Sequence, residues 1–272
     1  TIFLYSELST TNSQQTYTQA EEILLKEIDL QDFEPSKQAV NIKSFSKSYA
    51  LTSRLDAEYY QKKYEQVIER ITSQNYDKLI NLVNIKKSIE PGSMYYDTEG
   101  LPFMRVADYN KYGLTEPQKY LSENFAKENE EAIKSLKPQK GTILFSKDGS
   151  VGTAYHLREK FNGITSGAIL HLKVKDEKKI VPEYLTLALN SQVVKMQSER
   201  DAGGSIILHW RVSEIENVVV PIIDFTKQKE IAKLIENSFA LKKEREHLLK
   251  VSKRAVEISI EIKEDEASKY IK

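Results

Sequence analysis

The last 47 residues of the chain, 226–272, contain neither glycine nor proline. Lys, Glu, Leu and Ala, which all have high helix propensity, make up much of this stretch. A single helix of this length would extend about 70 Å at 1.5 Å per residue, well beyond a compact domain. The sequence therefore predicts a long C-terminal helix that projects from a separate folded region upstream.

A seven-residue repeat runs along this predicted helix. One position of the repeat is apolar throughout, and the position three residues earlier is mostly serine or arginine. An apolar line beside a small or polar line suits close packing against another helix better than an autonomous zipper. A solvated helix with accidental heptads is the alternative, although an isolated helix is hard to stabilise. The predicted packing residues are Ile231, Leu234, Leu241, Leu248, Ala255 and Ile262.

Glycine divides the rest of the chain, because all ten glycines lie between Gly92 and Gly204. Apolar residues at three- and four-residue spacings predict amphipathic helices before this region, and short β-branched runs with turns predict strands within it. The predicted helices span 13–31, 54–73, 126–134 and 182–196, and the predicted strands span 79–83, 142–145, 168–174 and 218–221.

These patterns predict an α+β fold. We expect a mixed α/β domain with many short strands, followed by a long C-terminal helix of the coiled-coil type. The predicted segments are an N-terminal helical segment at 1–53, the mixed domain at 54–224 and the long helix at 225–272.

Composition excludes several classes of protein. Forty Lys and Arg balance forty Asp and Glu, and there is no cysteine, which excludes a disulfide-stapled secreted domain and thiolate chemistry. No apolar run is long enough to span a bilayer and the first residues do not resemble a signal peptide, so the cytoplasm is the expected compartment. A neutral chain is not expected to coat nucleic acid by bulk electrostatics, but a local basic patch remains compatible with it.

The motifs of common enzymes are missing. The chain has no phosphate-binding G-x-x-x-x-G-K-[ST] or G-x-G-x-x-G loop, no G-x-S-x-G elbow, no Asn-Pro-Pro-Tyr tetrad, and four scattered histidines without metal-ligand spacing. Glu261-Ile262-Lys263 imitates part of a nuclease site, but such triplets arise by chance when 29% of residues are charged. We therefore predict no catalytic residue and no metal ligand, and consider a methyltransferase or nuclease activity in this chain the least favoured option.

The most informative stretch is 137–152, KPQKGTILFSKDGSVG. It predicts a turn, a buried strand and a glycine-rich turn that presents Ser146, Lys147 and Ser150 at the end of the strand. Short polar side chains and exposed amides on such a turn suit contacts with phosphates or base edges. A purely structural hairpin would explain the same glycines.

This stretch resembles the L-x-x-G-D-I-L-x-S-x-D-G-S-x-G hallmark of the target-recognition domain in specificity (S) subunits of type I restriction-modification systems. Thr142 and the 222–224 segment depart from the family pattern. Further segments similar to the family occur in the same order as in its members: 17–25, 54–60, 100–108, 163–168, 182–185, 203–205, 218–223 and 228–232.

The resemblance implies a non-catalytic subunit that reads one half of a bipartite site in double-stranded DNA. The long helix would act as a ruler and as the dock for DNA methyltransferase (M) subunits, which carry S-adenosylmethionine and methylate adenine; this chain itself would bind no cofactor. A restriction (R) subunit, and a second S half or a second copy joined through antiparallel helices, are the other implied partners, in the cytoplasm of a prokaryote. A half-subunit, a fragment of a two-domain subunit and part of a fused enzyme all fit the single domain.

Basic and polar residues on the loops of the mixed domain are the candidates for DNA contact. Arg105 and Lys147 come first, although Arg105 also suits a salt-bridged strand arginine and Lys86-Lys87 a plain solvated pair. Acidic residues are expected elsewhere, away from Lys86, Arg105 and Lys147. The rival hypothesis is an adaptor whose domain binds protein and whose helix oligomerises. The DNA-binding candidates are Lys86, Lys87, Ser88, Arg105, Lys111, Lys147, Ser150, Ser205 and Arg211.

Overall fold

The computed structural model describes residues 2–204, 206–262 and 270, and their contacts divide the chain into two compact units. The smaller unit joins the two ends of the chain, up to residue 25 and from residue 229 onward, and the larger unit comprises 26–228. These units differ from the three predicted segments, because residues 26–53 group with the domain that follows them rather than with the first helix.

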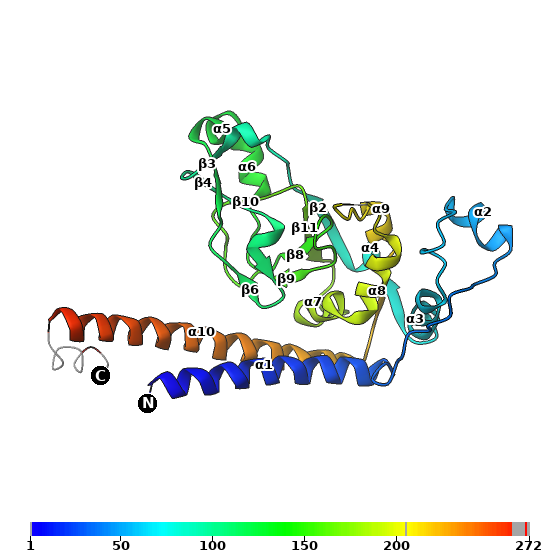
Figure 1. The fold of residues 1–272 in the computed structure, drawn as a ribbon, viewed down its shortest axis with the longest axis horizontal. Helices are drawn as coiled ribbons and strands as arrows, with labels where there is room; N and C mark the ends of the chain where they lie inside the picture. Colours follow the sequence, from blue (N-terminus) through cyan, green and yellow to red (C-terminus); the bar gives the residue numbers. More distant parts are fainter. Residues whose placement is uncertain (1, 205, 263–269, 271–272) are drawn as a thin grey trace. The chain divides into compact units, whose positions relative to one another are not determined.

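The smaller unit is a pair of antiparallel helices, α1 (Ile2–Glu27) and α10 (Phe225–Glu261), which run along one another in opposite directions (Figure 1). Small hydroxyl residues meet where the helices touch: Ser13 Oγ donates to Ser238 O at 2.9 Å, and Ser238 Oγ donates to Ser13 O at 2.7 Å. The hydroxyls are satisfied within the pair, so a serine can take a buried position. Other buried residues of the described part of this unit are Tyr17, Ala20 and Leu24 on α1 and Ile231, Ala232, Ile235, Ala255 and Ile258 on α10.

The long C-terminal helix is confirmed. Asp224 begins it, because its Oδ1 accepts the backbone N–H of Thr226 at 2.8 Å and of Lys227 at 3.3 Å, as an N-cap residue does. Of the predicted packing residues, Ile231 and Ala255 are buried, and Leu234, Leu241 and Leu248 are half-buried. Ile262 follows the last residue of α10 and is 60% exposed.

Two four-stranded sheets organise the larger unit. The first has the order β2-β11-β8-β9 and is antiparallel throughout. Every residue of β8 and the first four residues of β11 are buried, as the β-branched and apolar run at 142–145 predicts for β8. The strands are β2 (Val83–Lys87), β8 (Ile143–Ser146), β9 (Ala154–His156) and β11 (Ile169–Val174).

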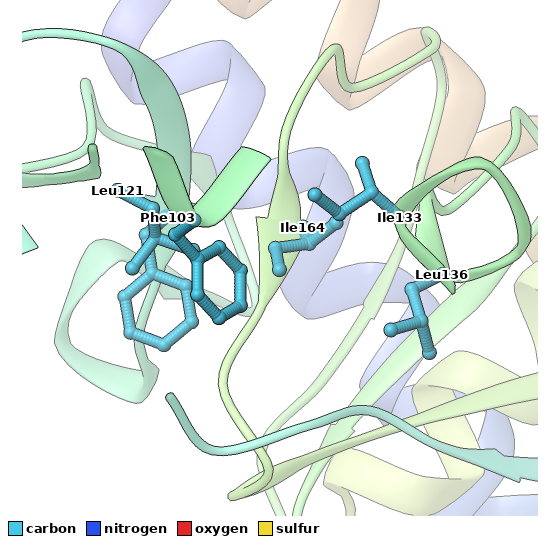
Figure 2. Close-up of a cluster of buried hydrophobic side chains, with 6 residues drawn as sticks. Phe103, Leu121, Ile133, Leu136 and Ile164 are labelled. Carbon is cyan, nitrogen blue, oxygen red and sulfur yellow. The ribbon is translucent and has the colours of Figure 1, made fainter. Parts of the chain in front are cut away.

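The second sheet has the order β10-β4-β7-β3, and β10 is parallel to β4. A separate hydrophobic cluster lies between this sheet and two helices, with Phe103, Leu121 and Ile164 from the strands against Ile133 and Leu136 (Figure 2). The elements are β3 (Tyr96–Asp97), β4 (Leu101–Met104), β7 (Lys119–Leu121), β10 (Ile164–Thr165), α5 (Glu123–Glu128) and α6 (Glu130–Leu136).

Short elements complete the unit. Two small strand pairs are β1 (Tyr76–Lys78) with β12 (Val219–Pro221), and β5 (Tyr109–Asn110) with β6 (Gly113–Leu114). The helices are α2 (Tyr49–Thr52), α3 (Lys62–Thr72), α4 (Leu79–Leu82), α7 (Pro182–Asn190), α8 (Gln192–Asp201) and α9 (Val212–Ile215), with 3₁₀ turns η1 (Phe45–Lys47), η2 (Ser93–Tyr95) and η3 (Val106–Asp108).

The α+β fold with short strands is confirmed, but some predicted elements differ. Residues 79–82 form a helical turn rather than a strand, and the amides of Leu79 and Ile80 at its start donate to the carbonyls of Val218 and Glu216. The helix predicted over 54–73 begins only at Lys62. The helix predicted over 182–196 is interrupted at Ser191, whose backbone is extended.

Candidate nucleic-acid interface

The glycine-rich turn at 147–152 follows the buried strand β8 and is locked from beneath. The buried Ser146 hydroxyl donates to the carbonyl of Ser150 and accepts the N–H of Thr153 at 2.9 Å. The amide of Gly152 closes the turn on Ser146 O at 2.9 Å. Gly149 and Gly152 have φ values of +73° and +80°, a conformation that glycine adopts without strain. The turn therefore has one defined shape.

A second glycine loop, 203–211, is joined to this turn by main-chain hydrogen bonds. Trp210 N donates to Lys147 O at 2.7 Å, and Gly149 N donates to Leu208 O at 2.9 Å. Within the loop, Gly203 and His209 exchange two hydrogen bonds. The buried Trp210 ring lies 5.8 Å from the Phe145 ring of β8, which anchors the loop in the core. We call the two loops together, 147–152 and 203–211, the platform.

On the platform, the carboxylate of Asp148 has two side-chain partners. The ammonium of Lys147 contacts Asp148, whose other carboxylate oxygen lies 2.9 Å from His209 Nδ1. The imidazole of His209 is 65% exposed, and Arg211 is exposed beside it. Sequence reasoning missed His209, because it looked for histidine in metal-ligand spacing only. Its place between a glycine pair and Trp210 is the signal that could have found it.

A cavity of 520 Å³ lies beside the second loop, lined in part by Arg54, Gly203, Gly204, His209 and Arg211. Arg54 forms a forked pair with Asp56, at 2.9 and 2.6 Å, and its remaining nitrogen donates to Asp201 O at 3.0 Å. The hydrogen bond from this guanidinium lowers the pKa of the Asp56 carboxyl. Each acid of the cavity is thus neutralised by an arginine.

Arg54 is held in place by its neighbours. The ring of Tyr59 lies 4.4 Å from the Arg54 guanidinium and 5.2 Å from that of Arg200, so the tyrosine contacts both cations. Arg200 in turn pairs with Asp201 at 2.7 Å. The Arg54–Tyr60 segment that resembles the family therefore fastens the loop before the platform, a role that its helical pattern did not predict.

Three strands that lead to candidate site residues end at one place. In the register of the first sheet Lys87 lies opposite Leu170, and Leu170 lies opposite Phe145, so β2 and β8 end on the same side. The carbonyl of Ala168 accepts Lys147 N at 2.9 Å, and the carbonyl of Thr165 accepts the Ser88 hydroxyl.

The third strand, β4, reaches the same place from the second sheet. Its last carbonyl, that of Met104, accepts Ser166 N at 2.8 Å. Hydrogen bonds to residues 165–168 thus hold Ser88, Met104 and Lys147 along one edge.

The predicted DNA-contact residues divide into groups. Lys147, Ser150 and Arg211 lie on the platform. Lys86 and Lys87 are the last two residues of β2, and Ser88 and Arg105 directly follow β2 and β4. The ammonium of Lys86 contacts the carbonyl of Ser135, and Lys111 lies over the ring of Tyr112 at 5.1 Å in the β5–β6 turn. Ser205 lies outside the described residues.

The expectation that acidic residues stay away from this edge is wrong. Asp148 pairs with Lys147, and Asp108 lies 3.6 Å from Arg105 Nε and accepts the Arg105 amide at 2.8 Å. Both acids hold loop backbone or cations in position, which their sequence neighbours alone did not reveal. Lys147 and Arg105 therefore have acidic partners within the chain.

The sequence model of the family described as type I restriction modification DNA specificity domain matches residues 76–251, which include the whole platform. The chain belongs to this family. This confirms the resemblance drawn from the motifs. Among the described residues of this specificity domain, there is no cluster of acidic or histidine side chains fit to hold a metal ion, and no helix long and apolar enough to cross a membrane.

Solved structures similar to this specificity domain include proteins of restriction systems. The S subunit of a type I system from M. genitalium aligns over 69% of this chain and 44% of its own, with 16% identity and a TM-score of 0.48. The HsdS subunit from Thermoanaerobacter tengcongensis aligns over 95% and 54%, with 14% identity and a TM-score of 0.44. The type IIG restriction endonuclease BpuSI aligns over 69% and 30%, with 13% identity and a TM-score of 0.49.

This chain therefore spans about half or less of the length of those proteins. A search of the curated proteins found no match.

Proposed function

We propose that this specificity domain reads one half of a bipartite site in double-stranded DNA, as a non-catalytic subunit of a DNA adenine methyltransferase complex. The observation that carries the proposal is the platform, in which two glycine loops are joined by main-chain bonds at the end of a buried sheet. A rigid platform can hold side chains in the fixed geometry that base readout requires.

The chemistry of the platform suits both kinds of DNA contact. Lys147, Arg211 and His209 can bind phosphates and set the register, while Ser150 can reach a base edge. The tip of the second loop exposes Ile206, Ile207 and Leu208, which are 95%, 54% and 41% exposed. Apolar side chains at such a position can contact thymine methyl groups or enter a base step.

The long helix is proposed as the dock for methyltransferase subunits, which would supply S-adenosylmethionine. Towards its end α10 exposes Val256 and Ile260, at 59% and 80%, one turn apart on the same side. Exposed apolar residues in a row on a helix are suited to a partner helix. A restriction subunit, and a second S half or a second copy, are further proposed partners of the same assembly.

Selection of DNA from a random-sequence duplex pool tests the reading function. A DNA methyltransferase subunit of a type I system is used with and without the chain, and the retained duplexes are sequenced. We expect one half-site to be enriched only when the chain is present. Lys147→Ala should lower the affinity for that half-site by about 1–3 kcal/mol, whereas Lys173→Ala, on the exposed far end of β11, should not.

The adaptor hypothesis keeps one observation in its favour, the exposed apolar row on α10. It expects the domain to bind another protein and the helix to oligomerise through this row, without any change in the DNA that the methyltransferase retains. Equal sequence composition in both selections would therefore reject the reading function and leave the adaptor.

A further inference from the structure

Residues 36–55 form a segment of unusual composition, which we call the basic arm. It contains Lys37, Lys43, Lys47 and Arg54 and no Asp or Glu. With 40 acidic residues in 272, a segment of 20 residues would hold about three on average. The arm leads from the turn after α1 to α3, and Figure 1 shows α2 at its outer end.

The base of the arm is fixed to the fold. Asn41 Nδ2 donates to Tyr60 O at 2.8 Å and to Glu65 Oε2 at 2.9 Å, and Lys43 pairs with Glu65. The amide of Ser36 donates to Gln66 Oε1 at 3.1 Å. Because α3 holds the arm at these points, the exposure of its other residues is a property of a built surface rather than of a loose loop.

The outer part of the arm is exposed and unpaired. Phe45 and Leu51 are 69% and 77% exposed, and Ile42 is 93% exposed. Lys37 and Lys47 are exposed too, and neither has an ion-pair partner among the residues that the structure describes. Such a concentration of exposed apolar and cationic side chains indicates a binding surface.

The arm is continuous with the platform. Its last cation, Arg54, donates to Asp201 O, two residues before the second platform loop, and lines the same cavity as His209 and Arg211. Leu55, which is 81% exposed, lines that cavity as well. A duplex on the platform would therefore have the arm as the next surface along its backbone.

We propose that the basic arm is a second DNA-binding element, which contacts the phosphate backbone beside the half-site that the platform reads. The proposal rests on the proposed function of the platform. Lys37 and Lys47 supply unpaired cations, the hydroxyls of Ser44 and Ser46 suit phosphate oxygens, and Phe45 and Leu51 pack on sugars or enter the minor groove. The four cations and the absence of acidic residues give the arm a positive potential, which is complementary to the polyanionic backbone of DNA.

The salt dependence of DNA binding tests the arm. The double variant Lys37→Gln/Lys47→Gln is compared with the matched control Lys173→Gln/Lys178→Gln, whose two exposed lysines lie at or beyond the end of β11 away from the platform. Both remove the same charge. The plot of log affinity against log salt for a random-sequence duplex should become shallower by about two in the arm variant and keep its slope in the control.

The enriched half-site should be the same for the arm variant and the wild type, because phosphate contacts carry no base information. Phe45→Ser/Leu51→Ser should weaken binding without changing the salt slope, since it removes no cation.

The outcomes separate the two proposals. If the wild type enriches no sequence, the reading function fails. If the wild type enriches a half-site and the arm variant keeps the wild-type salt slope, the arm proposal alone is wrong. Loss of methyltransferase binding by Phe45→Ser/Leu51→Ser with unchanged DNA affinity would also overturn it and assign the arm to a protein partner.

Discussion

The platform and the basic arm present their positive charges in opposite ways. On the platform, Lys147 is paired with Asp148 and His209 lies against the same carboxylate, whereas Lys37 and Lys47 of the arm have no such acid beside them. A paired cation is held in one geometry and exchanges its carboxylate partner only for a ligand that fits that geometry. An unpaired cation attracts any phosphate. Under the proposed function, the platform would supply selectivity for a DNA sequence and the basic arm would supply general affinity for DNA.

The largest expected effect comes from removing the anchor of the platform. Trp210→Ala should lower the free energy of unfolding by about 3–5 kcal/mol, because a buried aromatic side chain is lost. It should also abolish half-site enrichment while the arm still binds DNA with little selectivity. Denaturant unfolding and pool selection measure the two effects.

Trp210→Phe is the control for this substitution. It keeps an aromatic ring against Phe145 and removes an indole N–H that has no hydrogen-bond partner among the described residues, so it should cost less. Equal loss of stability in both variants would contradict the anchoring role of the ring.

Acid should lower the free energy of unfolding through protonation of His171. Burial lowers the pKa of His171 to about 4, from 6.5 in the unfolded chain, and its Nε2 is hydrogen-bonded to the Thr165 hydroxyl at 2.8 Å. Between these values the unfolded chain binds more protons, so stability falls as the pH drops through about 6.5 to 4, by about 3 kcal/mol.

Unfolding measured at pH 7 and at pH 4.5 tests this effect. The pH dependence should be smaller in His171→Asn, which cannot take up the proton. The arm has no histidine, so substitutions in it should leave the dependence unchanged. An unaltered pH profile in His171→Asn would rule out this residue as the origin.

The shape of the second loop should depend on one glycine of its pair. A Cβ on Gly204, where φ is +126°, would lie 2.1 Å from Ile207 O, whereas a Cβ on Gly203 meets nothing within 4 Å. Gly204→Ala should therefore cost about 1–3 kcal/mol and reduce half-site enrichment, while Gly203→Ala should leave both nearly unchanged. Identical selection profiles for the two variants would show that the loop tip does not take part in reading.

The smallest effect should come from removing the acid that pairs with the platform cations, which would leave them unpaired like those of the arm. Asp148→Asn removes the carboxylate that Lys147 and His209 share. The plot of log affinity against log salt for a random duplex should become steeper by about one. The ratio of the affinity for the half-site to the affinity for a random duplex should fall. A shallower slope would mean that Asp148 does not restrain these cations.

The sequence predicted well what depends on local pattern. The all-apolar run at 142–145 and the glycines after it identified β8 and its turn, and the absence of glycine and proline identified α10. It could not predict what depends on distant partners. In the helical turn at 79–82, the first two amides donate to Val218 and Glu216. The turn at 147–152 pairs with 203–211 through bonds between residues about sixty positions apart. His209 gained its place only through that pairing.

Three of the bonds that join the platform loops to each other and to the 165–168 segment are made by main-chain atoms: Trp210 N to Lys147 O, Gly149 N to Leu208 O, and Lys147 N to Ala168 O. Such bonds do not depend on which side chains the residues carry. The outward-facing side chains can therefore be exchanged during evolution without dismantling their support. A scaffold of this kind is free to acquire new target sequences while its glycines and Trp210 stay the same.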